Sequence, residues 1–429
     1  MRVCYQHWLN CLTILTGKKN QYCSDHTSLS SIFSETQFET LWILTNVSSG
    51  TTHQTQAVVA AGAVPKLISL LQSKTAKVSD QAVWALGNIV GDGSYARDIA
   101  IANGVVEPIL KMVHEGSQDA LYRHNIAWLV SNLFRAKNPS MSFEVVQVLL
   151  PAVVSFLNDQ NGIVVASACW SISYFTKEVS NVQAFINSGS LQKLVSLLDS
   201  QEESIVLPAL RSIGHIVSGP DEHTDFTIGC NVLPRLASLL KASNGRICRD
   251  ATWAISNIVS GTTAQIQKVI EAGVLPILIE VLDKSDCSCQ HEAAWAITNI
   301  TSKGTHEQIV FMVDQHQVLK PFCNLMTAMK VETVNVVLGG LLNILRLARS
   351  IGGLESLCIK MEEIEAVDKL ESLLVHDNED VYLKAFQIID EFFEHNDDHE
   401  DVPTVAPRND IDNCIFSPPG PGGDGFFNF

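Results

Sequence analysis

Short apolar tracts recur along this chain at an almost constant spacing. The tract at residues 67–71 reads Leu-Ile-Ser-Leu-Leu, and similar tracts follow at intervals of 42, 44, 41, 42, 42, 44 and 48 residues. Their last residues are Leu71, Val113, Leu157, Leu198, Leu240, Leu282, Met326 and Leu374. Within each repeat the apolar residues fall three and four positions apart, and almost no stretch alternates as a strand would. This pattern predicts an all-α chain.

Glycine and proline mark the junctions between the predicted helices. Several tracts follow a glycine that would end the preceding helix, and several have a proline in their first turns. These residues are Gly62, Gly104, Gly189 and Gly273, and Pro65, Pro108, Pro234 and Pro276. A period of about 40–47 residues with two or three helices per repeat is typical of armadillo and HEAT arrays.

Each such repeat must stack on its neighbours to bury its apolar face, which produces a superhelix with a long concave surface. We therefore expect residues 37–395 to form a right-handed α-solenoid of about eight armadillo repeats. Residues 1–36 are expected to be an atypical amino-terminal segment. Residues 396–429, acidic and then rich in proline and glycine, are expected to be a disordered tail.

A second signature runs through the same repeats, because a tryptophan is followed four residues later by an asparagine. The pairs are Trp42/Asn46, Trp84/Asn88, Trp128/Asn132, Trp253/Asn257 and Trp295/Asn299. Residues at i and i+4 share one helical face, so the repeat sets an indole and an amide side by side in a row. A lone tryptophan at this spacing is usually a core residue. Five in phase with asparagine, which is seldom fully buried, favour an exposed ridge.

Such a row suits the binding of an extended, lysine-rich peptide. Neighbouring helices lie about 8–10 Å apart and alternate residues of an extended chain about 6.5–7 Å apart, so the two periods can match over a few residues. A lysine stem fits between two indoles, where its ammonium gains about 0.5–2 kcal/mol of cation–π attraction. An asparagine amide both donates to and accepts from a peptide main chain.

Composition narrows the classes of function. The net charge of −17 argues against nucleic acid as a partner and is compatible with a basic polypeptide. No apolar run is long enough to predict a membrane span. The eleven cysteines are scattered, and no metal spacing, phosphate-binding loop or nucleophile motif is present, so we expect neither a cofactor, a metal nor an enzyme activity.

The segments Leu41–Thr51, Asp80–Asp92, Asp250–Asn257 and Glu292–Asn299 resemble the importin-α (karyopherin-α) family, adaptors that bind nuclear localisation signals in the cytoplasm and carry them to the nucleus. The resemblance implies a major peptide site, in which Asp92 pairs with the most important lysine. Its residues are Trp42, Asn46, Ser49, Gly50, Thr55, Gln81, Trp84, Asn88, Asp92, Asn125, Trp128, Asn132 and Trp170.

The resemblance also implies a minor site for the second basic cluster of bipartite signals. Its residues are Arg211, Val217, Asp250, Trp253, Ser256, Asn257, Glu292, Trp295 and Asn299. Between the two sites Trp170 is followed by Tyr174, and Arg211 with His215 stands where a tryptophan and an asparagine would be. A cationic Arg211 would repel a basic peptide and divide the groove.

The chain departs from the family in three respects. Residues 1–65 contain only Arg2, Lys18 and Lys19 as basic residues, so the family's basic importin-β-binding segment is missing there and importin-β is a doubtful partner. Ile163, Ser167 and Lys177 replace acidic residues near Trp170, which should weaken lysine selection nearby. His215 replaces asparagine.

Two functions therefore stay open. One is a nuclear import adaptor for proteins with mono- or bipartite signals. The other is a cargo-binding isoform that retains cargo in the cytoplasm or acts as a dominant negative. The resemblance further implies that the last helical repeat, near Val381–Phe393, and the acidic residues 390–401 bind an export receptor. A catenin-type scaffold would need a basic groove, and the acidic residues argue against it.

Overall fold

The computed structural model describes residues 26–135 and 138–393, with side chains from residue 35 onward. Every regular element in these ranges is a helix, which confirms the all-α prediction. Most of the expected amino-terminal segment (1–36) and the tail (396–429) lie outside the described residues. Helix α2 begins at His26, so the predicted boundary at residue 37 falls inside a helix.

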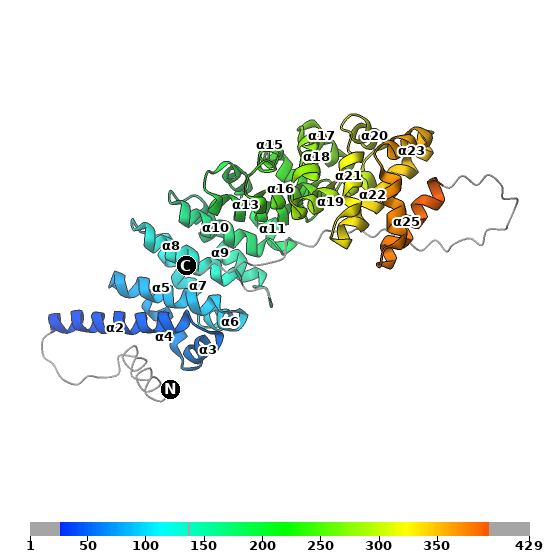
Figure 1. Ribbon diagram of the computed structural model, residues 1–429. Coiled ribbons are helices and arrows are strands. Elements are labelled where there is room, and N and C mark those ends of the chain that lie inside the picture. Colours follow the sequence, from blue (N-terminus) through cyan, green and yellow to red (C-terminus); the bar gives the residue numbers. More distant parts are fainter. Residues whose placement is uncertain (1–25, 136–137, 394–429) are drawn as a thin grey trace. The chain divides into compact units, whose positions relative to one another are not determined.

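The helices follow one another with short connections (Figure 1). They are α2 (His26–Ser48), α3 (Thr52–Ala60), α4 (Ala63–Leu70), α5 (Ala76–Gly91), α6 (Ser94–Ala102), α7 (Val106–Glu115), α8 (Ala120–Arg135), α9 (Phe143–Leu157), α10 (Gly162–Phe175), α11 (Val179–Asn187), α12 (Leu191–Ser196), η1 (Leu197–Asp199), α13 (Glu203–Val217), α14 (Asp221–Gly229), α15 (Leu233–Leu239), α16 (Gly245–Ile258), α17 (Thr263–Glu271), α18 (Val274–Lys284), α19 (Cys287–Lys303), α20 (His306–Asp314), α21 (Leu319–Asn324), η2 (Leu325–Thr327), α22 (Val331–Ser350), α23 (Leu354–Glu363), α24 (Ala366–Ser372), η3 (Leu373–Val375) and α25 (Glu379–Phe392).

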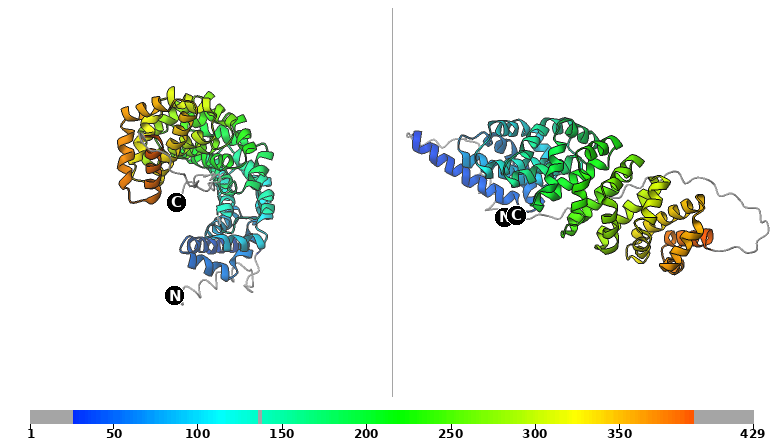
Figure 2. Two further views of the ribbon diagram at one scale, coloured as in Figure 1. Left: turned by 90° about the vertical axis from the view of Figure 1, so that its right-hand side faces the viewer. Right: turned by 90° about the horizontal axis from the view of Figure 1, so that it is seen from above.

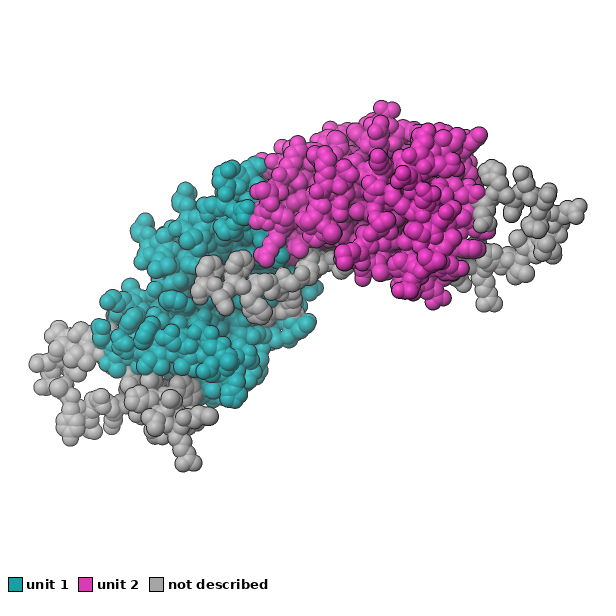
Figure 3. Space-filling model, in the orientation of Figure 1, with its two compact units in different colours: residues 1–212 teal, residues 213–429 magenta. Residues whose placement is uncertain are grey.

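The chain forms two compact units, residues 1–212 and 213–429, with the division inside helix α13 (Figure 3). A repeat typically has a first helix, a short second helix and a longer third helix. Within unit 1 the third helices α2, α5, α8 and α10 pack each against the next, and within unit 2 α16, α19, α22 and α25 do the same (Figure 2). Stacking of successive repeats therefore builds the core of each unit, as armadillo repeats require.

The junction between the first and second helix of a repeat requires a left-handed backbone. Gly62, Gly104, Gly189 and Gly273 have φ values of 76°, 80°, 72° and 67° there, as predicted for glycines that end a helix. Three later repeats have no glycine at this place, and Asn231, Gln317 and Glu365 take φ values of 61°, 52° and 58°. The same turn forms with and without glycine, so packing of the repeat imposes it and these three residues carry the strain.

One repeat lacks the junction altogether. Gln147 stands 43 residues after Gly104, and α9 runs unbroken from Phe143 to Leu157. Pro151, which is in phase with Pro65 and Pro108, lies inside this helix. The first and second helices of this repeat therefore continue as a single helix.

Helix α22 is the one described helix that is long and apolar enough to cross a membrane by length and composition. This qualifies the expectation that no span would be found. Half of its most apolar window is buried inside the fold, with Val337, Leu341 and Leu345 fully buried. It packs between α19 and α25, as a core helix of a stacked array does.

Candidate functional site

The predicted tryptophan and asparagine pairs lie on third helices, α2, α5 and α8 in unit 1 and α16 and α19 in unit 2. Trp42 and Trp84 are 54% and 49% exposed, as expected of an open ridge. Trp128 and Trp295 are partly exposed, as is Trp170 on α10. Trp253 is only 3% exposed, so the expectation of exposed indoles is wrong at this position.

Glycines of the preceding third helix form the seats of two of these indoles. A Cβ built on Gly87 would lie 2.1 Å from Cζ3 of Trp128, and one built on Gly214 would lie 2.0 Å from Cζ3 of Trp253. Gly87 and Gly214 stand at equivalent places, three residues after Trp84 and Arg211. Only a residue without a side chain allows these rings to approach the neighbouring backbone so closely. Neither glycine was expected at the site from the sequence, although the phase of each within the repeat could have revealed it.

The asparagines join each third helix to the one before it. In four repeats the amide donates from Nδ2 to the backbone oxygen three residues after the previous repeat's tryptophan position. The bonds are Asn88 to Thr45 (3.1 Å), Asn132 to Gly87 (3.1 Å), Asn257 to Gly214 (3.2 Å) and Asn299 to Ser256 (3.0 Å). This role explains why Asn132 and Asn257 are each only 5% exposed, contrary to the expectation that the asparagines lie on an open ridge.

Asn46 differs from these four. Its amide donates to Trp42 O within its own helix at 3.0 Å, and it is exposed. Each of the other four asparagines uses one N–H of its amide to bond the preceding third helix. Within the described residues, Oδ1 of those four asparagines accepts no hydrogen bond, which leaves it for a ligand's N–H.

The other residues expected in the major site divide into two groups. Ser49 and Gly50 are exposed after α2, and Asp92 is half-buried as the C-cap of α5. Three side chains are instead buried and support the face from beneath. Thr55 donates from Oγ1 to Ser48 O (3.2 Å), Gln81 from Nε2 to Thr45 Oγ1 (2.7 Å), and Asn125 from Nδ2 to Asp80 Oδ1 (2.7 Å).

The chain's own cations cover the aromatic side chains on α10. Trp170 stacks on Tyr174 with ring centroids 5.8 Å apart. The Arg211 guanidinium lies 5.7 Å from the Trp170 ring, and Lys177 Nζ lies 5.7 Å from the Tyr174 ring. These contacts occupy the π faces that a peptide lysine would use. That Arg211 interrupts the groove stays a prediction.

Unit 2 holds the residues expected in the minor site. Val217 is buried, and its backbone oxygen accepts from Thr224 Oγ1 at 3.3 Å. Ser256 is also buried. The His215 ring meets the Trp253 indole edge to face, with centroids 5.5 Å apart.

The two expected carboxylates of this site, Asp250 and Glu292, are both buried, at 0% and 6% exposure. Asp250 Oδ1 accepts from Arg249, with Nε at 3.1 Å and Nη2 at 2.7 Å. Burial raises the pKa of Glu292 to about 7, against the opposing attraction of Arg249 and Lys330. Arg249 was not expected at the site from the sequence, although it stands one helical turn before Trp253.

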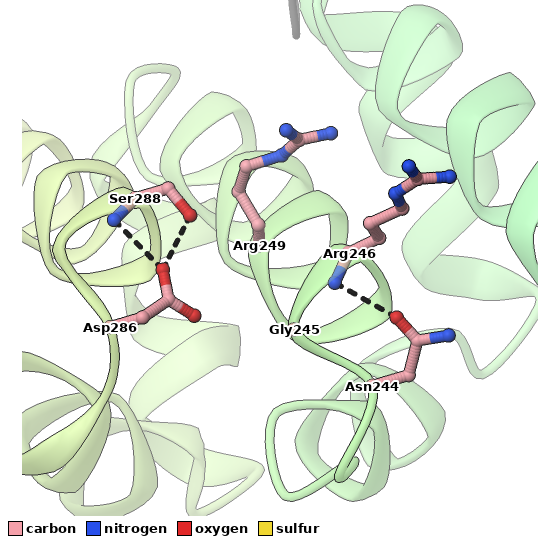
Figure 4. Close-up of a pocket in the computed structure, with 6 residues that line it drawn as sticks. All are labelled: Asn244, Gly245, Arg246, Arg249, Asp286 and Ser288. Carbon is pink, nitrogen blue, oxygen red and sulfur yellow. Dashed lines mark hydrogen bonds between the residues drawn. The ribbon is translucent and has the colours of Figure 1, made fainter. Parts of the chain in front are cut away.

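Arg249 also lines a cleft at the amino-terminal ends of α16 and α19 (Figure 4). Asn244 and Asp286 cap these helices by accepting from the backbone N–H groups of Arg246 and Ser288, at 3.0 and 2.9 Å. Figure 4 shows the side chains of Arg246 and Arg249 extending from α16 on the same side.

Comparison with known proteins identifies the type of repeat. Residues 51–91, 179–218, 220–260 and 262–302 match the armadillo/beta-catenin-like repeat, and residues 355–408 match the atypical Arm repeat. A crystal structure of an engineered protein has a TM-score of 0.71 over 90% of this chain and 98% of its own; at 22% identity it shows the fold alone. A computationally designed armadillo repeat protein for modular peptide recognition has a TM-score of 0.51 at 25% identity, over 55% of this chain and 99% of its own.

Two curated relatives cover most of the chain. Importin subunit alpha-1b of Oryza sativa subsp. japonica is 38% identical over 85% of this chain and 69% of its own length. Importin subunit alpha-3 of Arabidopsis thaliana is 39% identical over 88% and 72%. With its armadillo-repeat solenoid, the chain belongs to the importin-α family of nuclear import adaptors.

Proposed function

We propose that this protein binds lysine-rich nuclear localisation signals along the tryptophan and asparagine face of unit 1, as an adaptor moving between cytoplasm and nucleus. The observation that carries the proposal is the pair of half-exposed indoles, Trp42 and Trp84, on the adjacent helices α2 and α5. Large aromatic side chains that are exposed in register leave apolar surface in contact with water, which is unfavourable, and a ligand that covers them removes this contact.

Polar groups beside these indoles match an extended basic peptide. The asparagine carbonyl oxygens can accept peptide N–H groups whatever the peptide's side chains, so they set its register. Asp92 places a carboxylate at the C-terminal end of α5, where the helix dipole disfavours negative charge by about 0.3–1 kcal/mol. A lysine ammonium at Asp92 would remove this penalty, so the position favours a cationic ligand.

Other partners follow from the family. Helix α25 exposes Tyr382, Leu383 and Phe386, and its exposed face is the surface we assign to the export receptor. The basic residues within 1–65 are Arg2, Lys18 and Lys19, so these residues do not supply a basic cluster for importin-β. Gel filtration with importin-β, with and without a bipartite peptide, separates the two functions. Co-elution supports delivery of cargo, whereas peptide binding without co-elution supports retention.

The groove assignment is tested with a fluorescent monopartite lysine-rich peptide. Trp84→Ala removes an indole wall, and Asp92→Asn removes one charge. Each should raise Kd more than tenfold, which corresponds to about 1.4 kcal/mol. Phe226→Ala, which truncates a 61% exposed aromatic side chain on α14, should leave Kd unchanged. Equal affinities in all three variants and the wild type would remove the basis for the proposal.

The same variants report on stability. Because Trp84 is half-exposed and Asp92 opposes the helix dipole, neither change should lower the melting temperature by more than a few degrees. Loss of peptide binding with retained stability therefore separates a binding role from a structural one.

A further inference from the structure

The acidic pair of unit 2 already faces a cation of its own chain. Arg249 lies four residues before Trp253, on the same helical face, and its side chain is 22% exposed. Its Nε and Nη2 both donate to Oδ1 of Asp250, whose side chain is fully buried. A guanidinium in this place satisfies the carboxylate that a peptide lysine would otherwise seek.

The equivalent positions on adjacent third helices of unit 1 carry different charges. Asp80 stands four residues before Trp84, Asn125 stands three residues before Trp128, and their side chains are joined at 2.7 Å. The equivalent residues in unit 2 are Arg249, four before Trp253, and Glu292, three before Trp295. A neutral amide facing an acid in unit 1 is thus replaced by an acid facing a cation in unit 2.

Glu292 is not fully satisfied by this arrangement. Its Oε2 is buried and has no hydrogen-bond partner among the described residues. The charged groups that act on it are Arg249 and Asp250 from α16 and Lys330 from the start of α22. Arg249 donates its hydrogen bonds to Asp250, so the buried Oε2 of Glu292 has no donor. An unsatisfied carboxylate oxygen of this kind marks a place that a second cation can enter.

The indole of Trp253 in unit 2 is also buried. Trp253 is 3% exposed, seated on Gly214 and against His215, and its Nε1 is buried without a partner among the described residues. Trp42 and Trp84 of unit 1, by contrast, are about half exposed. The two groove segments therefore differ in readiness for a ligand.

We infer that Arg249 gates the second groove segment: it occupies Asp250 as an internal competitor, and a basic side chain of a bipartite peptide must displace it to bind. The inference rests on the proposed function. It predicts that the upstream basic cluster of a bipartite signal adds little affinity in the wild type. A peptide cation can bind Asp250 only by replacing Arg249, which the chain supplies at high effective concentration.

The experiment compares two peptides that share the same downstream lysine cluster, one monopartite and one bipartite. The measured quantity is the ratio of their Kd values. Arg249→Gln keeps a donor for Asp250 and removes the charge, and it should raise the gain from the upstream cluster at least fivefold. The monopartite Kd should change less than twofold.

Arg246→Gln is the matched control, because it removes an exposed arginine from the same helix and the same cleft. It should leave the gain as in the wild type, which excludes a general effect of net charge. Arg249→Lys, which keeps the charge without the planar fork, should give an intermediate gain and serves if Arg249→Gln fails to fold.

Equal gains in Arg249→Gln and Arg246→Gln would overturn the gate and leave unit 1 binding intact. Failure of the monopartite peptide to bind the wild type would overturn the proposed function, and the gate with it. The two failures are therefore distinguished by the monopartite peptide alone.

Discussion

Gly87 offers the sharpest test of how the proposed groove is built, because its replacement should weaken peptide binding without removing any group that we expect to contact the peptide. Alanine at this position would bring its Cβ to 2.1, 2.7 and 2.9 Å from three ring carbons of Trp128. Carbon atoms in van der Waals contact lie about 3.5–4.0 Å apart, so the indole must move by about 1.5 Å.

Two effects on stability oppose each other. Gly→Ala inside a helix stabilises by about 0.5–1 kcal/mol, whereas overpacking destabilises by about 1–3 kcal/mol. Trp128 is partly exposed, so the ring can swing outward and most of the strain is relieved. We therefore expect a small net change in the free energy of unfolding. The displaced ring loses its part in the lysine slot, about 1–2 kcal/mol, which is a five- to thirtyfold rise in Kd.

The assay is fluorescence anisotropy with a monopartite lysine-rich peptide, paired with thermal unfolding followed by circular dichroism. Gly339→Ala is the matched control, since Gly339 also lies inside a third helix and its added Cβ would meet no atom within 4 Å. It should raise the melting temperature and leave Kd unchanged. If Gly87→Ala also raises the melting temperature and keeps Kd within twofold of the wild type, the glycine seat does not position the indole.

Three further outcomes follow from the described contacts. Gln317→Gly should raise the melting temperature, because it removes backbone strain of about 1–2 kcal/mol at a φ of 52°. The added entropy of the unfolded chain costs less than this strain, so a lower melting temperature would contradict the prediction. Asn132→Ala should lower the free energy of unfolding by about 1 kcal/mol, because the hydrogen bond to Gly87 is lost. Asn103→Ala, which loses a bond within its own helix, should not. Equal urea midpoints for the two variants would argue that the asparagine bonds between repeats do not stabilise the fold. Glu292 has a folded pKa of about 7, above its ordinary 4.5, so stability is lost as pH rises from about 4.5, where the unfolded carboxyl ionises, to about 7, where the folded one does. The melting temperature should therefore fall between pH 4.5 and 7 and fall less in Glu292→Gln, and parallel pH profiles would show that this carboxyl is not responsible.

The predicted helix ends succeeded where local chemistry is decisive. Glycine at Gly62, Gly104, Gly189 and Gly273 removes the steric penalty of a left-handed residue, so the sequence alone marks those junctions. Asn231 belongs to a residue type that tolerates the same turn, whereas Gln317 and Glu365 make it without such a signal. Only their place in the stacked repeat reveals them, because tertiary packing there outweighs local preference.

The asparagines show a second limit. Their recurrence was interpreted as an exposed ridge for a peptide, yet Asn132 and Asn257 are buried and hold the previous helix. Thr55, Gln81 and Asn125 hydrogen-bond to groups of the chain itself, a role that their sequence pattern does not reveal, and their contact with a ligand stays a prediction. A repeat pattern shows that positions are equivalent. It does not show which neighbour each polar atom meets.

The spacing of apolar residues, indoles and amides is enough to predict an all-α array of stacked repeats, because spacing along a helix decides which residues share a face. Which indoles lie open and which acids are already paired depends on contacts between repeats. Trp84 and Trp253 have the same sequence context of tryptophan followed by asparagine, but one is 49% and the other 3% exposed. Trp253 lies against Gly214 and His215 of the preceding third helix, and contacts between repeats of that kind are set by the fold.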